Sequence, residues 1–414
     1  MTRGKRTWIF VIASAAALVA IVAASFALLL ARPSGPAQAS AGDGDGIGTA
    51  KYMTADGAGT VSANAVTIPN WGSSFTDPTN GVTYPYSMVG TNPASETSTT
   101  VPFVIIPLDF TFDNAPTGVN PTLAGSSKVP ATVASPVFQG TADIGAATST
   151  ASAAPTDAGV APSPRLENEP SDTTQVGDAF VRAQWNKVGT GYHVLLGQPT
   201  VLATQSISVP KNQGVMVVGS RSHARIGLMS YYWFSAHLQN LMVSMHIPAT
   251  VVPLFLTYNT FLYIGSTSNC CVLGYHGAMS SLNGNGHQQV NTYMFAAYSD
   301  GGIFGANDGD NGFSYIRDIH ALSHEVTEWL DDPFINNEVN PWLTPTAPQY
   351  GCTTDLETGD PVVGFGFTVT MPGGAQYHPE DEVFFSWFAR QDPSISSVGY
   401  YTYLNNFAGV AQGC

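Results

Sequence analysis

The segment from Ser314 to Leu330 constrains the fold of this chain most, because its pattern is that of an amphipathic helix. Apolar residues recur in it at steps of three and four, which predicts one buried stripe along a helix: Ile316, Ile319, Leu322, Val326 and Leu330. Ser314 stands where an N-cap residue would stand, and Pro333 prevents the helix from continuing much further. We therefore expect a helix from roughly Ser314 to Leu330 that packs on the core.

The polar side of this helix carries groups that bind metal ions. In a helix, positions i, i+4 and i+8 project within roughly 80° of one another. His320, His324 and Glu328 have this spacing and lie beside the apolar stripe. One helix can supply at most two ligands of a tetrahedral metal ion, so a third ligand must come from another segment, and water takes the fourth position.

The run His324-Glu325-Val-Thr-Glu328 resembles the active-site helix of zincin-like metallopeptidases in its HExxE variant, where Glu replaces the usual second His. The resemblance implies that His324 and Glu328 bind a metal ion and that Glu325 activates water. It also implies an α+β fold in which a mixed β-sheet is followed by the active-site helix. The resemblance extends from Ser314 to Asp360 and identifies no subfamily.

The third ligand is expected in the acidic segment from Tyr350 to Pro361. In zincins whose third ligand is a glutamate, that residue follows the helix in a later segment, and Glu357 matches this position. Asp360 is the alternative, either as a ligand or as an acceptor that holds a ligand in place. The segment equally fits an acidic turn that binds no metal.

Three further side chains are candidates for the site. His378 and its neighbour Tyr377 would stabilise an oxyanion from the C-terminal segment, and His378 is also an alternative to Glu357 as ligand. His320 is expected to support the site, because Ala321 stands where a catalytic Glu would follow it. His276 is the remaining candidate.

The ligand set affects both the metal and the chemistry. Two carboxylates and one imidazole around a divalent cation make a nearly neutral site, so bound water is acidified less than at His-rich sites. Activity would then depend more on Glu325 as the base. Zn²⁺ is the expected ion, and Mn²⁺ or Ca²⁺ remains open because carboxylates suit them well.

Composition limits the partners of the protein. Of its 414 residues, 44% are hydrophobic, which is ample for a sizeable core. Asp and Glu number 29 against 14 Lys and Arg, giving a net charge of −15. This balance argues against binding to nucleic acid or to anionic membranes, because both need basic patches.

The N-terminus predicts export. Basic residues lie between Met1 and Arg6, no charge occurs from Trp8 to Ala31, and small residues end at Ala41. Residues 1–41 are therefore expected to be a cleaved signal peptide or a membrane anchor through residues 8–31, and the protein to be secreted or held at the cell surface.

Four cysteines in an exported chain predict two disulfide bonds. Adjacent cysteines fit a disulfide poorly, so Cys270 and Cys271 are expected to pair with Cys352 and Cys414, in either order.

Residues 42–100 are rich in small and polar residues and predict a low-complexity spacer. A β-branched run from Val101 begins a single zincin-like domain, expected at 101–414 with a low-complexity insertion at about 147–170. Helices are predicted at 174–188 and 230–243, and strands crowd between 250 and 298. After the helix expected from Ser314 to Leu330, the chain is predicted to be mostly helical or loop, with a helix from Asp381 to Arg390.

These features predict a secreted metal-dependent hydrolase, expected to be a peptidase that acts on a protein or peptide substrate. Glu325 would take a proton from water held by the cation. The alternative is a non-catalytic secreted or cell-surface binding protein on a zincin-like scaffold, which the low charge and the missing second His favour.

Overall fold

The computed structural model describes residues 45, 47, 51–52, 57–141, 173–283, 285–304, 315–343, 352–394, 399–404 and 406–414. These residues belong to one unit, Ala41–Cys414. The predicted signal peptide or anchor and the predicted insertion at 147–170 lie outside them. Among the described residues, no helix has both the length and the apolar character needed to cross a bilayer.

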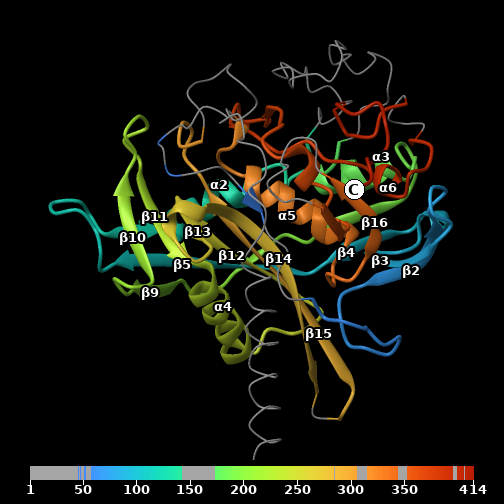
Figure 1. Ribbon diagram of the computed structural model, residues 1–414. Helices are drawn as coiled ribbons and strands as arrows, with labels where there is room; N and C mark the ends of the chain where they lie inside the picture. The colour runs from blue at the N-terminus through green and yellow to red at the C-terminus, as the bar shows by residue number, and fades with distance from the viewer. Residues whose placement is uncertain are drawn as a thin grey trace, which may run out of the picture. The chain divides into compact units, whose positions relative to one another are not determined.

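One mixed sheet of eleven strands dominates the described part of the chain and curls into a half-barrel (Figure 1). Its main path is β10-β11-β13-β14-β15-β12-β5-β6, and β1, β8 and β9 pair with strands of this path. β12 is parallel to β15 and β5, whereas β14 is antiparallel to β13 and β15. The strands are β1 (Lys51–Tyr52), β5 (Phe103–Phe112), β6 (Thr122–Ala124), β8 (Thr200–Val201), β9 (Gln205–Val209), β10 (Gly214–Val218), β11 (Arg225–Ser230), β12 (Val252–Tyr258), β13 (Thr260–Tyr263), β14 (Cys270–Leu282) and β15 (Gln288–Tyr298).

The central strands are buried on both faces, because a helix covers each side of the sheet. Side chains alternate along a strand. In β14, Tyr275 faces α4 (Tyr231–Met245), where its ring lies 6.4 Å from that of Phe234. Gly274 and His276 face α5 (His320–Asp331), where they meet Glu325. Burial on both faces explains why these strands are almost continuously apolar.

The chain before β5 is more ordered than the sequence predicts. Residues expected to be a spacer form β2 (Asn70–Thr76), β3 (Thr83–Val89) and β4 (Ser98–Val101), and β4 pairs in parallel with β7 (His193–Leu196). The β2–β3 hairpin packs its aromatic rings on Phe385, which lies 5.2 Å from Phe75 and 4.8 Å from Tyr86. A few large rings on one face are enough to fix this hairpin among small polar residues.

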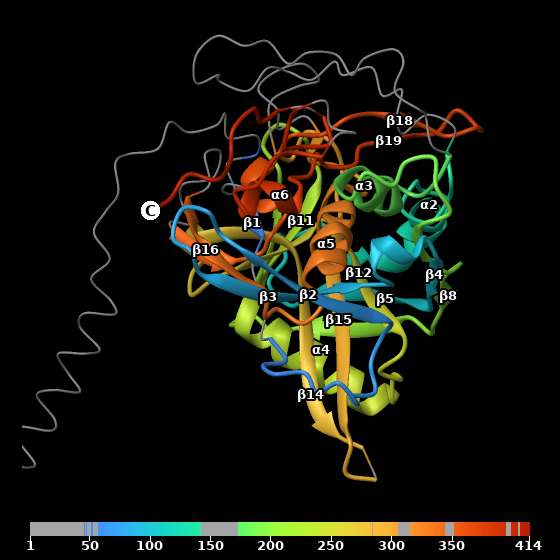
Figure 2. The same ribbon diagram turned by 90° about the vertical axis from the view of Figure 1, so that its right-hand side faces the viewer.

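The helix expected from roughly Ser314 to Leu330 is confirmed as α5, but it begins at His320, and Ser314 lies outside the described residues. Asp318 has a φ of 44°, so the helix cannot extend through it. Its carboxylate accepts a hydrogen bond from the backbone N–H of Ile319. α3 (Val176–Gln184) lies beside α5 (Figure 2), and α2 (Val129–Val133) precedes the insertion.

The C-terminal part contains less helix than predicted. The helix expected from Asp381 to Arg390 is only the single turn α6 (Phe385–Phe388). Val383 forms a bridge with Thr402, and Arg390 has a φ of 53°, so the backbone is not helical on either side. The remaining elements are β16 (Glu338–Leu343), β17 (Cys352–Asp355), β18 (Val369–Thr370) and β19 (Gln376–Tyr377).

The number of disulfide bonds is confirmed, but the expected pairing is wrong. Cys270 bonds to its neighbour Cys271 at the buried start of β14. Cys352 bonds to Cys414 because the C-terminal residues run beside β16, where Leu343 pairs with Cys352 and donates its N–H to the carbonyl of Gln412. Neither bond links the sheet to the C-terminal part.

Candidate metal centre

The candidate site lies where α5 crosses β14 and β15. Its side chains are deeply buried: His324 and Glu325 have 0% of their surface exposed, and Glu328 has 3%. The apolar side of α5 holds it on the sheet, and the indole N–H of Trp329 donates to the hydroxyl of Thr292 on β15. Because this packing fixes α5 on the sheet, the positions of its polar side chains are fixed as well.

His324 and Glu328 meet as the helical spacing predicts. Nε2 of His324 lies 3.1 Å from Oε2 of Glu328 and 4.0 Å from Oδ1 of Asp360. Nδ1 of His324 lies 2.6 Å from Oε2 of Glu380. With Nδ1 directed at Glu380, Nε2 is the ring nitrogen that faces the carboxyl groups of Glu328 and Asp360.

The acidic segment after β17 supplies the remaining groups. Potential ligand atoms of His324, Glu328 and Asp360 all lie within 4.8 Å of one another. Glu357, the expected third ligand, is hydrogen-bonded through its side chain to Glu328. The 3-10 turn Asp360–Val362 directs Asp360 back toward the helix. Asp360, the alternative third ligand, therefore lies closer to His324 than Glu357 does. Glu357 is hydrogen-bonded to Glu328 instead.

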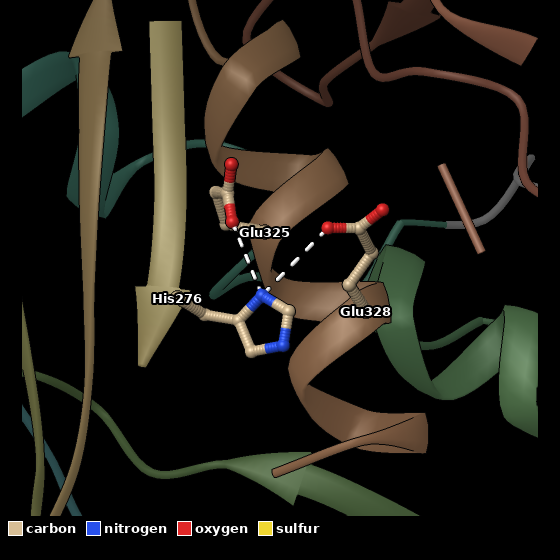
Figure 3. Close-up of side chains that lie close together, drawn as sticks. All are labelled: His276, Glu325 and Glu328. Atoms are coloured by element: carbon tan, nitrogen blue, oxygen red, sulfur yellow. Dashed lines mark hydrogen bonds and ion pairs between the residues drawn. The ribbon is translucent and has the colours of Figure 1, made fainter. Parts of the chain in front are cut away.

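His276 brings a second imidazole to the same helix (Figure 3). Its Nδ1 lies 3.3 Å from Oε2 of Glu325 and 3.7 Å from Oε2 of Glu328. Its Nε2 lies 3.2 Å from the backbone carbonyl oxygen of Asp332, which follows the last turn of α5. Figure 3 shows the ring of His276 reaching from β14 to a point between the two carboxyl groups.

A set of buried groups behind the helix holds the first imidazole. Glu380 accepts the hydrogen bond from His324 through one oxygen, and its other oxygen accepts the N–H of Gly364 at 3.1 Å. Ser323 accepts the backbone N–H of Glu380 at 2.9 Å. Nε2 of His320 lies 3.5 Å from Oε1 of Glu380, so this histidine is part of the same group of buried side chains.

Two glycines leave room for these side chains. A Cβ atom on Gly359 would lie 2.2 Å from Nδ1 of His324, and one on Gly274 would lie 2.5 Å from Oε1 of Glu325. No real Cβ atom makes such contacts, so a larger residue at either position would displace the functional side chain. The backbone N–H groups of Gly359 and Asp360 also donate to Oε1 of Glu328, at 3.1 and 3.3 Å.

Burial dominates the electrostatics of the site. Burial, and then the neighbouring carboxyl groups, raise the pKa of Glu325 well above its usual value. Burial raises the pKa of Asp360 to about 6, although His324 opposes this rise. Burial lowers the pKa of His276 and of His320 to about 3, so both rings are neutral. Burial thus favours the uncharged forms of these groups, and a divalent cation would displace protons from the carboxyl groups that bind it.

The structure places His378 in a different group. Its Nδ1 lies 2.6 Å from Oδ2 of Asp318, and its Nε2 lies 2.8 Å from a guanidinium nitrogen of Arg317. The hydroxyl of Tyr377 donates to the carbonyl of Ala131. His378 therefore contacts the residues that precede α5, and Tyr377 contacts α2. Their hydrogen bonds are not with Glu328.

Glu380 is a residue of the candidate site that the sequence did not indicate. It follows His378 and Pro379 in a segment without helical or strand periodicity, so no spacing connects it with His324. His276 could be identified only as a lone histidine in a predicted strand. The signal for it lies in the alternation of β14, which puts Gly274 and His276 on one face.

The chain has no match among protein-family models, curated proteins or solved structures. The zincin-like resemblance therefore rests on the helix motif His324-Glu325-Val-Thr-Glu328 alone.

Proposed function

We propose that the protein is a metal-dependent hydrolase of zincin-like type that acts on a protein or peptide substrate. His324, Glu328 and Asp360 would hold a divalent cation, with Zn²⁺ expected. Glu357 would orient Glu328 or replace Asp360 as ligand. We also propose that the protein is exported, because its N-terminal sequence has the pattern of a signal peptide or membrane anchor.

One observation carries the proposal. Nε2 of His324 lies 3.1 Å from the carboxyl oxygen Oε2 of Glu328, while Nδ1 lies 2.6 Å from Oε2 of Glu380. Two acceptors this close need a proton or a cation between them. A histidine whose outer nitrogen donates to a carboxylate is the arrangement found around protein-bound zinc.

The residues have distinct roles in this function. A bound cation would polarise a carbonyl group and make a water molecule more acidic. Glu325 follows His324 directly on α5, and we assign it the base that accepts the proton of that water. Burial raises the pKa of this carboxyl group, whereas a cation bound nearby would lower it, so that Glu325 could accept the proton of the water and then pass it to a leaving group.

Metal content and turnover test the proposal together. The purified protein should contain zinc, and a chelator should remove it along with hydrolysis of a denatured protein such as casein. Glu325→Gln should keep the ion bound through His324 and abolish hydrolysis, whereas His324→Ala should lose that ion. An active Glu325→Gln variant would falsify the role of Glu325, and a protein without stoichiometric metal would exclude the site.

A second function is favoured by the burial of the site. Glu325 and His324 expose none of their surface, and the side chain of Asp360 exposes only 13%. Such a site also suits a structural cation in a non-catalytic binding protein. Bound metal whose removal lowers thermal stability, with no turnover of any peptide tested, would support this alternative.

A further inference from the structure

We propose that His276, Glu325 and Glu328 form a second cation site that shares Glu328 with the first, and that an ion bound there inhibits hydrolysis. The inference rests on the proposed function, because it concerns the regulation of the same site. It assigns a role to the buried histidine of β14 that the proposed hydrolysis leaves unused.

The spacing of the atoms fits a metal ion. Ligands about 2.1 Å from a tetrahedral ion lie roughly 3.4 Å apart. Nδ1 of His276 lies 3.3 Å from Oε2 of Glu325 and 3.7 Å from Oε2 of Glu328, on either side of this value. Potential ligand atoms of all three residues lie within 4.8 Å of one another.

The tautomer of His276 is set by the helix end. The carbonyl oxygen of Asp332 can only accept a hydrogen bond, so the proton of the neutral ring lies on Nε2, at 3.2 Å. The lone pair on Nδ1 then points between Glu325 and Glu328 (Figure 3). Asp332 is itself held, because its carboxylate accepts the backbone N–H groups of Asn336 and Asn337. A histidine whose outer nitrogen donates to a backbone carbonyl is oriented to bind metal through the other.

Glu328 connects the two sites through one oxygen. Oε1 is occupied by the N–H groups of Gly359 and Asp360, so Oε2 faces both His324 and His276. Two ions each about 2.1 Å from this oxygen would be at most about 4.2 Å apart, close to the roughly 3.5–4 Å of two-metal sites.

The charge of the cluster also accommodates two cations. Within the described residues, the ion pairs of Glu325, Glu328 and Glu380 are all with histidines. Each carboxyl group that binds an ion would release its proton, so carboxylates of the same cluster would balance the charge of a second cation. A second ion would still bind more weakly than the first, because the first ion repels it at short range.

Occupation of the second site removes the base. When Oε2 of Glu325 binds an ion, that oxygen cannot also accept a proton from water. Its other oxygen faces the backbone at Gly274 and has no hydrogen-bond partner among the described residues. In that position it cannot accept the proton of the water instead. The first equivalent of metal should therefore activate the protein and the second should inhibit it.

Equilibrium dialysis of the metal-free full-length protein against increasing Zn²⁺, with metal measured by mass spectrometry, tests the inference. We expect two equivalents to bind, the second at least tenfold more weakly, and hydrolysis to fall as the second binds. His276→Ala should bind one equivalent and should show no inhibition. His276→Asn provides a second variant if the smaller side chain disturbs the core, with folding checked by circular dichroism. The control is His287→Ala, an exposed histidine of the β14–β15 turn, which should bind two.

The outcomes separate the two proposals. One equivalent in the wild-type protein at every Zn²⁺ concentration, or two equivalents in both folded His276 variants, would overturn the second site and leave the proposed function standing. No bound metal would overturn both. Glu325→Gln provides a further check, because it should retain the first equivalent and lose the second.

Discussion

Nδ1 of His324 lies 2.6 Å from Oε2 of Glu380, a residue 56 positions further along the chain, and both side chains are completely buried. This hydrogen bond fixes the rotation of the imidazole ring. It thereby decides which nitrogen of His324 faces Glu328. The C-terminal segment thus sets the orientation of His324, the proposed ligand on α5.

Glu380→Gln should weaken the binding of the first Zn²⁺ ion by about 10–100-fold, because the replacement removes the charge that raises the basicity of His324. Isothermal titration of the metal-free protein measures this change. Glu338→Gln, at an exposed position of β16, is the control and should bind as the wild-type protein does. Unchanged affinity in Glu380→Gln would mean that the His324 ring is not a ligand.

Gly359→Ala should displace the ring of His324, since a Cβ atom at this position would lie 2.2 Å from Nδ1. We expect a loss of about 1–3 kcal/mol in the free energy of unfolding, as for other overpacked sites, together with weaker metal binding. Chemical denaturation and metal titration would detect both changes. Gly373→Ala is the matched control, because nothing lies within 4 Å of the point that its new methyl group would occupy. Equal effects of the two substitutions would contradict the close packing around His324.

Asp331 should make the protein less stable as the pH rises. Burial raises the pKa of this carboxyl group from 3.8 to about 7, although Gln184 donates a hydrogen bond to it. Below pH 4 both the folded and the unfolded states are protonated, and the group has no effect. Between pH 4 and 7 the unfolded state releases its proton first, so folding stability falls, by up to roughly 4 kcal/mol.

Asp331→Asn should therefore flatten this part of the stability profile, because the amide has no proton to lose and can still accept from Gln184. Urea unfolding at pH 4, 6 and 8 measures the effect. Asp332 titrates near the same pH and retains part of the slope. Equal slopes in the variant and the wild-type protein would show that Asp331 does not keep its proton in the folded state.

The two disulfide bonds should contribute very differently to stability. The bond between Cys352 and Cys414 closes a loop with a sequence separation of 62, which in the chain-entropy model corresponds to about 4 kcal/mol. The bond between Cys270 and Cys271 has a separation of 1 and restricts the unfolded chain very little. Serine at both positions of the long loop should lower the urea midpoint clearly.

Alanine at Cys270 and Cys271 should change the urea midpoint only through altered packing in the core. A larger fall in the urea midpoint for this pair than for the pair at Cys352 and Cys414 would contradict the entropic argument.

Periodicity explains which parts of the fold could be predicted. The strands between residues 250 and 298 and the helix α5 have regular patterns of apolar residues. These patterns do not depend on the surface against which each element packs. The start of α5 could not be predicted, because it depends on the left-handed backbone of Asp318. The β2–β3 hairpin could not be predicted either, because its burial depends on Phe385, which lies far away in the chain.

The same distinction applies to the candidate site. Helical spacing alone brings His324 and Glu328 together, so their proximity followed from the sequence. The choice between Glu357 and Asp360 depends on a turn whose direction no spacing reveals. Glu380 and His276 reach α5 from a loop and from a strand, and only tertiary packing puts them there.

The complete burial of His324 and Glu325 also has a kinetic consequence. Solvent does not reach either side chain in this structure, so local opening of the fold has to precede both the exchange of a cation and the entry of a substrate. The half-life of exchange with isotopically labelled zinc should then follow amide hydrogen exchange in α5, and the metal would report how often this helix opens.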